Sequence, residues 1–183
     1  LIKRVGNYFY EFIEKSGMDT SQSAFFIANE YLKAHRKPKT IFIDAIGVGS
    51  GVVARLNESD FREIPTIGIK VSNKADDDLY LNKRAELTYR LREALEDEGK
   101  MVNDDMAIGE LVAQRFEITE KGQTKIIEKK KIKEELGRSP DRSDAMILTC
   151  SNIVVTNEYV DALHERRLDN EFGFNNEGDA GSW

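Results

Sequence analysis

The feature that most constrains the fold is a short apolar segment, Thr40–Ile43, which is followed at once by an acid and then by glycines. A β-branched and aromatic run of this length, coming after Pro38, is typical of a strand buried on both faces. Asp44 stands where this strand ends, and the glycines lead into apolar residues at helical spacing, Val52–Leu56. The segment predicts a strand–loop–helix unit that presents the Asp44 carboxylate at a sheet edge, with a simple loop cap as the alternative role for that side chain.

The composition predicts a folded domain followed by an acidic tail. Of the 183 residues, 40% are hydrophobic and 33% are charged, and no apolar run is long enough to cross a membrane. The single Cys150 excludes an internal disulfide and a cysteine-based zinc site, and fits a reducing cytoplasm. The residues from Asn157 onward carry −5 of the net charge of −6. We therefore expect a main domain over 1–156 and a mobile tail over 157–183.

A second acid-bearing segment, Leu136–Thr149, is predicted to form a late helix. Ser139 is the expected N-cap and Pro140 the expected first helical residue. Asp141 then falls in the first turn, where the helix dipole favours an anion. Asp144 comes three residues later and projects near the same face.

The remaining pattern alternates between strand and helix signals, which indicates a mixed α/β sheet. Four basic residues of the helix over 79–98 (Lys83, Arg84, Arg90 and Arg92) are interpreted as a solvated face, and the lysines of 129–133 either as phosphate contacts or as a solvated run. The predicted elements are strands over 1–5, 8–14 and 66–71, helices over 20–37, 51–60 and 79–98, and a hairpin of 111–118 with 124–128.

Two carboxylates with no histidine or cysteine nearby suit hard cations such as Mg²⁺ or Mn²⁺. If the late helix packs beside the end of the early strand, Asp44 and Asp144 converge. Two such ions can activate a water molecule and stabilise the leaving oxygen of a phosphodiester. The residues alone therefore indicate a candidate phosphoryl-transfer site, and two purely structural caps are the alternative.

Three segments of the sequence also occur, in this order, in one family of viral enzymes: IFIDAIGVGSGVVARL, YLNKRAELTYRLREALE and LGRSPDRSDAMILT. Over about Leu1–Val155 the chain resembles the nuclease domain of tailed-phage terminase large subunits, the DNA-packaging motors. The resemblance implies a ribonuclease H-like fold, with a mixed central sheet flanked by helices and a β-hairpin insertion near the last helices. It also implies an endonuclease that cuts concatemeric viral DNA during genome packaging with two Mg²⁺ or Mn²⁺ ions.

The same resemblance assigns the site residues. It implies that Asp44, on the family's fourth strand, and Asp144, on its last helix, are catalytic and bind metal. It ranks Asp141 lower, as an assisting metal ligand, and gives Lys130 and Arg142 contacts with the DNA backbone.

The chain departs from the family pattern at its start. The family's first catalytic aspartate lies on a central strand ahead of the hairpin, whereas the opening residues Leu1–Arg4 carry no acid. We therefore expect the sequence to start after that strand, which leaves open whether the chain is active in this form.

The resemblance further implies double-stranded DNA, the portal or procapsid, the small terminase subunit and an ATPase domain of the same full-length chain as partners. The expected location is the cytoplasm of the bacterial host, with no membrane. The alternatives are a non-catalytic module that docks on the portal or procapsid, another ribonuclease H-like nuclease such as a Holliday-junction resolvase, and a nucleotide-binding domain. The glycines of Gly47–Gly51 do not favour the last, because the Lys-Ser/Thr pair of a P-loop is missing.

Overall fold

The computed structural model describes residues 1–58 and 61–152 of the chain. The predicted acidic tail, 157–183, lies outside the described residues, as does the end of the predicted domain 1–156. Residues Leu1–Asn152 form one compact unit. Within the described part of this unit, no helix is long and apolar enough to cross a membrane.

The strands confirm the α/β class, but they are divided among three small sheets instead of one central sheet. Among the described residues no strand pairs with both β1 and β3, so the first two sheets remain separate. β1 and β2 are antiparallel, β2 and β5 parallel, β3 and β4 parallel, and β6 and β7 form the predicted hairpin. The strands are β1 (Ile2–Val5), β2 (Tyr8–Phe12), β3 (Ile41–Asp44), β4 (Thr66–Ile69), β5 (Lys100–Met101), β6 (Phe116–Ile118) and β7 (Thr124–Ile126).

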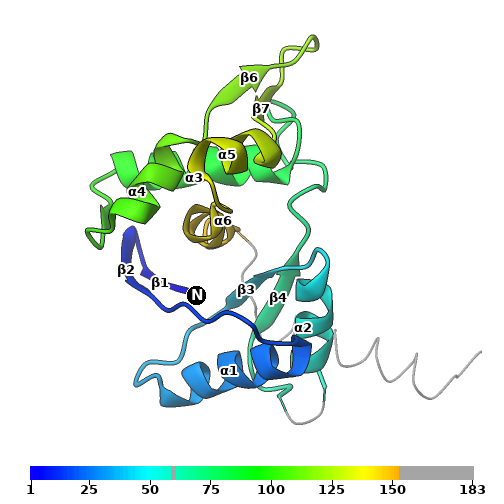
Figure 1. Ribbon diagram of the computed structural model, residues 1–183, viewed down its shortest axis with the longest axis vertical. Helices are drawn as coiled ribbons and strands as arrows, with labels where there is room; N and C mark the ends of the chain where they lie inside the picture. Colours follow the sequence, from blue (N-terminus) through cyan, green and yellow to red (C-terminus); the bar gives the residue numbers. More distant parts are fainter. Residues whose placement is uncertain (59–60, 153–183) are drawn as a thin grey trace, which may run out of the picture. The chain divides into compact units, whose positions relative to one another are not determined.

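The described residues form six helices, and the last of them lies at the centre of the unit. Helix α6 contacts α3 and α4 as well as β1 and β3, and lies between these two groups (Figure 1). The sequence pattern did not predict α4, α5 or the two-residue strand β5. The helices are α1 (Thr20–Lys33), α2 (Val48–Leu56), α3 (Lys83–Glu96), α4 (Asp105–Val112), α5 (Lys129–Leu136) and α6 (Asp141–Leu148).

Helix α1 begins as predicted, with a capping box. The Asp19 carboxylate accepts the Gln22 backbone N–H (2.8 Å), and the Gln22 side chain accepts the Asp19 backbone N–H (3.0 Å). The buried face carries Ala24 and Ala28, whereas Leu32 is 67% exposed because it falls at the edge of the apolar stripe.

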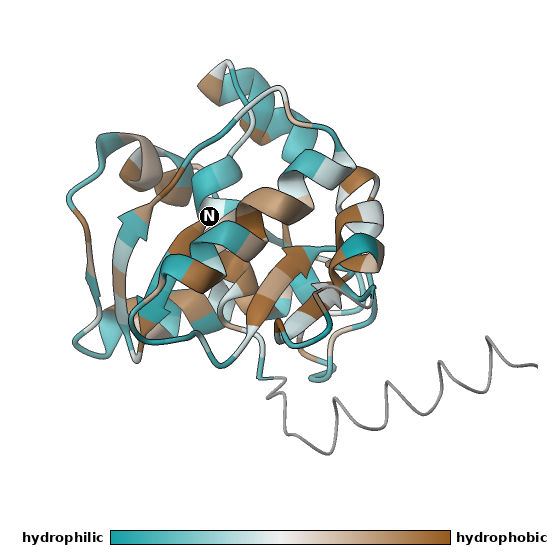
Figure 2. Cartoon of the chain, turned by 90° about the horizontal axis from the view of Figure 1, so that it is seen from below, coloured by the Kyte–Doolittle hydropathy of each residue, from teal (hydrophilic) through white to brown (hydrophobic). Residues whose placement is uncertain are grey.

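Two hydrophobic clusters can be followed in the described part of the chain, and Phe9, Leu87, Leu91, Met146 and Ile147 are buried outside them. Figure 2 shows the amphipathic pattern behind them, with hydrophobic and hydrophilic residues alternating along the helices. The first cluster joins α1 to α2 and consists of Ala24, Ile27, Ala28, Val52, Leu56 and Ile64. The second lies among α3, β7 and α5 and consists of Ala85, Ala113, Ile126, Ile127 and Ile132.

The predicted solvated basic face of α3 is wrong for three of its four residues. Lys83 and Arg90 bind the carboxylate of Glu86, whose side chain is only 1% exposed. Arg84 donates hydrogen bonds to Ile127 O (3.1 Å) and to a side chain that follows α4. Only Arg92 extends into solvent as predicted, with its side chain 61% exposed. A carboxylate buried in this way needs ion-pair partners. The i,i+3 and i,i+4 spacing of these residues allows both pairs, but the sequence alone does not reveal that Glu86 is buried.

Candidate active site

Asp44 is the last residue of β3, and its half-buried side chain lies where the strand ends. The strand runs parallel to β4, with Asp44 opposite Ile69, and the next backbone N–H, from Ala45, donates to Ile69 O (2.9 Å). The carboxylate oxygen Oδ1 is buried and has no hydrogen-bond partner. Because most buried polar atoms are hydrogen-bonded, an acceptor in this state is a candidate ligand atom.

Helix α2 approaches the end of β3 closely. It begins at Val48, earlier than predicted, so the sequence expectation of a loose glycine loop is only partly correct: Gly47 is the N-cap with a φ of 61°, but Gly49 is helical. A Cβ on Gly49 would overlap the backbone carbonyl oxygen of Asp44 and lie 3.0 Å from its carbonyl carbon. The absence of a side chain at Gly49 thus lets α2 pack directly on the backbone of Asp44.

Asp144 lies in the first turn of α6, and its carboxylate pairs with the Lys129 ammonium, Nζ, at 2.5 Å. Burial raises the pKa of the Asp44 carboxyl above its ordinary value. The charge of Lys129 and the backbone N–H of Ile46 oppose this rise in pKa, whereas the negative charge of Asp144 adds to it. The structure therefore brings Asp44, Asp144 and Lys129 within electrostatic reach of one another.

The other predicted site residues are placed differently. Asp141 is exposed. Among the described residues, no group of three or more His, Cys, Asp or Glu side chains is arranged to hold a metal ion. Lys130 is 81% exposed on α5. Arg142 is only 15% exposed and pairs with Glu14 at 2.6 Å and with Asp104. Arg142 is thus engaged within the fold, whereas Lys130 makes an exposed ion pair with Glu134 on the same helix (4.0 Å).

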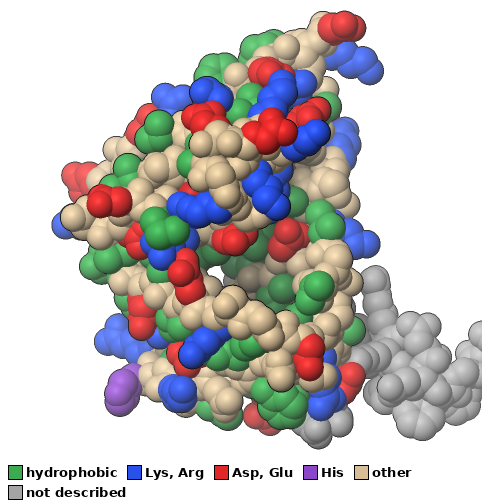
Figure 3. Space-filling view, in the orientation of Figure 1, with side chains coloured by type: hydrophobic (Ala, Val, Ile, Leu, Met, Phe, Trp, Pro, Cys, Tyr) green, Lys and Arg blue, Asp and Glu red, His purple; other side chains and the backbone are tan. Residues whose placement is uncertain are grey.

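Sequence reasoning missed Lys129, because nothing distinguishes it from the neighbouring lysines of 129–133. The hairpin beside these lysines also neutralises part of the run: Glu117 pairs with Lys125 at 2.9 Å and with Lys131 at 3.8 Å. Figure 3 shows basic and acidic side chains interspersed over the region of β6, β7 and α5. The surface over these elements therefore does not present a continuous patch of lysines that could bind phosphates.

The start of α6 also differs from the prediction. Its N-cap is Pro140, and the side chain of Pro140 makes no hydrogen bond to the helix. The prediction that Ser139 is the N-cap is therefore wrong. The backbone N–H of Ser143 instead donates to Glu110 Oε2 on α4 (2.8 Å). A residue distant in the sequence thus takes the role of the missing cap.

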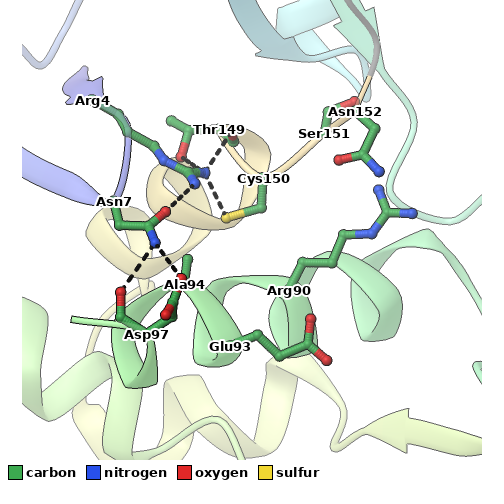
Figure 4. A pocket seen from close by; sticks show the side chains of 10 residues that line it. All are labelled: Arg4, Asn7, Arg90, Glu93, Ala94, Asp97, Thr149, Cys150, Ser151 and Asn152. Atoms are coloured by element: carbon green, nitrogen blue, oxygen red, sulfur yellow. Dashed lines mark hydrogen bonds between the residues drawn. The ribbon is translucent and has the colours of Figure 1, made fainter. Parts of the chain in front are cut away.

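A polar pocket of about 470 Å³ lies at the opposite end of α6. Figure 4 shows Arg4 from β1 reaching across it, where its guanidinium donates to Thr149 O (2.9 Å) and to Cys150 Sγ (3.1 Å). Cys150 is buried, and burial raises the pKa of its thiol, as is typical of a packing cysteine. Neither Asp44 nor Asp144 lines this pocket.

The raised pKa of Asp44 predicts a pH-dependent effect on stability. Because the folded state holds this proton more tightly, the group stabilises the fold fully below its unfolded pKa, about 3.9, and this contribution is lost as pH rises through the folded pKa. Asp44→Asn is therefore expected to unfold at a higher temperature than the natural protein at pH 7, by about 2–4 °C for each kcal/mol gained, and to lose this advantage towards pH 4.

Thermal unfolding between pH 4 and 8 in the presence of a chelator measures this effect. Asp141→Asn, which changes an exposed carboxylate in the first turn of α6, is the control and should lower the unfolding temperature by up to about 4 °C at pH 7, because it loses a favourable interaction with the helix dipole. A pH-independent difference for Asp44→Asn would contradict the prediction.

No protein-family model and no curated protein sequence matches the chain. Solved structures do share its fold. The nuclease domain of the large terminase subunit gp2 of bacterial virus Sf6 has a TM-score of 0.61 and 17% identity, over 84% of this chain and 81% of that chain.

Two structures of a lysine-to-alanine mutant of the same domain give similar results. The mutant with manganese has a TM-score of 0.67 and 18% identity, over 83% of this chain and 82% of that chain. The mutant with manganese and beta-thujaplicinol has a TM-score of 0.65 and 17% identity, over 84% of this chain and 81% of that chain. The present chain therefore has the ribonuclease H-like fold of the nuclease domain of a phage large terminase subunit.

Proposed function

We propose that the chain is a divalent-metal-dependent DNA endonuclease of a phage genome-packaging motor, and that Asp44 and Asp144 bind its metal ions. The observation that carries the proposal is the meeting of two acids from opposite ends of the domain. Asp44 contributes a buried carboxylate oxygen with no partner, and Asp144 lies close enough to raise the pKa of Asp44. Their place in a fold shared with terminase nuclease domains, two of them solved with manganese, supports the proposal.

The donor atoms fit a hard cation. Mg²⁺ is commonly bound by one or two protein carboxylates, with substrate phosphates and water completing its coordination. Asp44 and Asp144 would supply these carboxylates for two Mg²⁺ or Mn²⁺ ions, and Asp141 is a secondary candidate ligand. Two ions of this kind activate a water molecule and stabilise the leaving oxygen of a phosphodiester.

Lys129 sets the charge balance of the acid pair. Its ammonium neutralises Asp144 and favours ionisation of Asp44, which is the form that binds a cation. The same ammonium occupies Asp144 Oδ2, so a metal ion and Lys129 compete for that oxygen. Lys129 therefore offsets the repulsion between the two acids, and a bound metal ion would supply the positive charge in its place.

The proposal places the nuclease domain over 1–156 and the acidic tail over 157–183. Its substrate is concatemeric double-stranded DNA, with Lys130 as a candidate contact to the phosphate backbone. Its partners are the portal or procapsid, the small terminase subunit and an ATPase domain of the same full-length chain, in the cytoplasm of the bacterial host. The likeness to terminase nuclease domains supports these assignments.

Nicking of supercoiled plasmid by the full-length natural protein tests the function. Nicked and linear products are expected with Mn²⁺ or Mg²⁺, and chelation by EDTA should lower the rate to background, because two carboxylates alone cannot stabilise the leaving oxygen. Comparing linear duplex with a four-way junction separates the resolvase alternative. Cleavage that continues in EDTA, or that requires the junction, would contradict the proposal.

A further inference from the structure

Glu110 on α4 is completely buried, and both of its carboxylate oxygens are used near the start of α6. Oε2 accepts the Ser143 backbone N–H at 2.8 Å, and Oε1 binds the Arg138 guanidinium. Burying a carboxylate is costly unless it is paired and hydrogen-bonded, so a fully satisfied Glu110 fixes both of its partners firmly. Arg138 lies in the segment that joins α5 to α6, and Ser143 lies in the first turn of α6.

The start of α6 depends on Glu110, because its own N-cap residue offers no side-chain hydrogen bond. Gly137 ends α5 with a φ of 69°, and the N-cap Pro140 makes no side-chain hydrogen bond to α6. The first backbone N–H groups of a helix have no partners within the helix. Glu110 supplies one for Ser143, and its negative charge suits the positive end of the helix dipole.

A second contact holds Ser143 from the same side. The Gln114 side chain, just after α4, donates to Ser143 Oγ (3.0 Å) and accepts a hydrogen bond from Arg84 (2.9 Å). The neighbouring Arg142 binds Asp104, the N-cap of α4. The two residues immediately before Asp144 are thus attached to α4 and its flanking residues at three places.

From these contacts we infer that Glu110, with Arg138, is a positioning residue for the metal-binding carboxylate of Asp144. The inference rests on the proposed function. Glu110 acts through the main chain of Ser143, the residue next to Asp144, and fixes the first turn of α6 on α4. Outer-shell partners of metal ligands typically contribute about 10- to 100-fold in metal affinity or activity.

Glu110→Gln tests the inference, because it keeps the size of the side chain while removing its charge. Glu86→Gln is the matched control: Glu86 is 1% exposed and ion-paired with Lys83 and Arg90, but it makes none of the contacts at the start of α6. Binding of Mn²⁺ alone to the full-length protein is measured by calorimetry, well below the unfolding temperature of each variant. Asp144→Asn defines the part of the binding that belongs to this site.

We expect Glu110→Gln to weaken Mn²⁺ binding by about 10- to 100-fold, and Glu86→Gln to change it by less than about threefold even where both lose similar thermal stability. The Mn²⁺ midpoint for plasmid nicking should rise in parallel, and the rate at saturating Mn²⁺ should fall less than the midpoint rises. If Glu110→Gln does not fold, Arg138→Lys takes its place with the same expectation.

Equal Mn²⁺ affinities for the natural protein and the Glu110 variant, or equal losses in both glutamate variants, would overturn the positioning role. If Asp144→Asn binds Mn²⁺ as tightly as the natural protein does, the metal site itself fails, which is a failure of the proposed function. Loss of Mn²⁺ binding in Asp144→Asn with unchanged binding in Glu110→Gln overturns the positioning role alone.

Discussion

Asp44→Asn and Asp144→Asn are each expected to lower Mn²⁺-dependent plasmid nicking by the full-length protein more than about 100-fold, a loss beyond that typical of outer-shell residues. The asparagine side chain is neutral and nearly isosteric with aspartate, so each substitution removes a charged ligand without opening a cavity. Asp44→Asn also removes the ionisation that is unfavourable at the buried end of β3. Both variants should therefore stay folded while losing cleavage.

Asp141→Asn compares the secondary candidate ligand with the acid pair. Asp141 is in the same first turn of α6 as Asp144, but it is exposed. Its substitution should lower the nicking rate less than about 10-fold, well short of the loss expected for either acid of the pair, because a secondary ligand resembles an outer-shell residue in its effect. The assignment of the acid pair fails if either Asp44→Asn or Asp144→Asn retains Mn²⁺-dependent nicking, and a large loss in Asp141→Asn would instead make Asp141 a ligand.

Gly49→Ala is expected to destabilise the domain by about 3 kcal/mol or more. In an ordinary helix the same change would stabilise by up to about 1 kcal/mol, because alanine restricts the unfolded chain and favours helix. At Gly49 the new Cβ would overlap the Asp44 backbone carbonyl, which cannot move without disturbing the end of β3. Urea unfolding, followed by circular dichroism, measures the difference.

Gly109→Ala provides the contrasting case within the same protein. Gly109 lies in helix α4, and a Cβ added there would meet no atom within 4 Å. This variant should gain about 0.5–1 kcal/mol. If both glycine variants were stabilised, the close packing of α2 on Asp44 would be refuted.

The elements whose signals are local were predictable from the sequence. The strand that ends at Asp44, the capping box of α1 and the hairpin turn at Gly122 each depend on a few adjacent residues. Helix boundaries were less predictable, because α2 starts inside the glycines that usually mark a loop. A glycine is needed at position 49 because α2 packs closely on the backbone at the end of β3. The residues adjacent to Gly49 in the sequence do not reveal this contact.

The interactions that organise the candidate site were not predictable for a related reason. Lys129 and Glu110 are ordinary members of charged or amphipathic runs until the fold brings them to α6. Helix α4 itself went unpredicted, since Gly109 interrupts its short apolar pattern. The sequence could therefore name the two acids, but not the groups that hold them in place.

Helix α6 is fixed at both termini by elements that are far apart in the chain. Glu110 binds its first turn, and Arg4 of β1 binds the carbonyl oxygen of Thr149, the residue that caps its other end. Each residue inserted into a helix lengthens it by about 1.5 Å and rotates the residues beyond the insertion by about 100°. Between two such anchors the number of residues is therefore set: evolution can exchange side chains along this helix, but a single insertion or deletion would turn one anchor away from its partner.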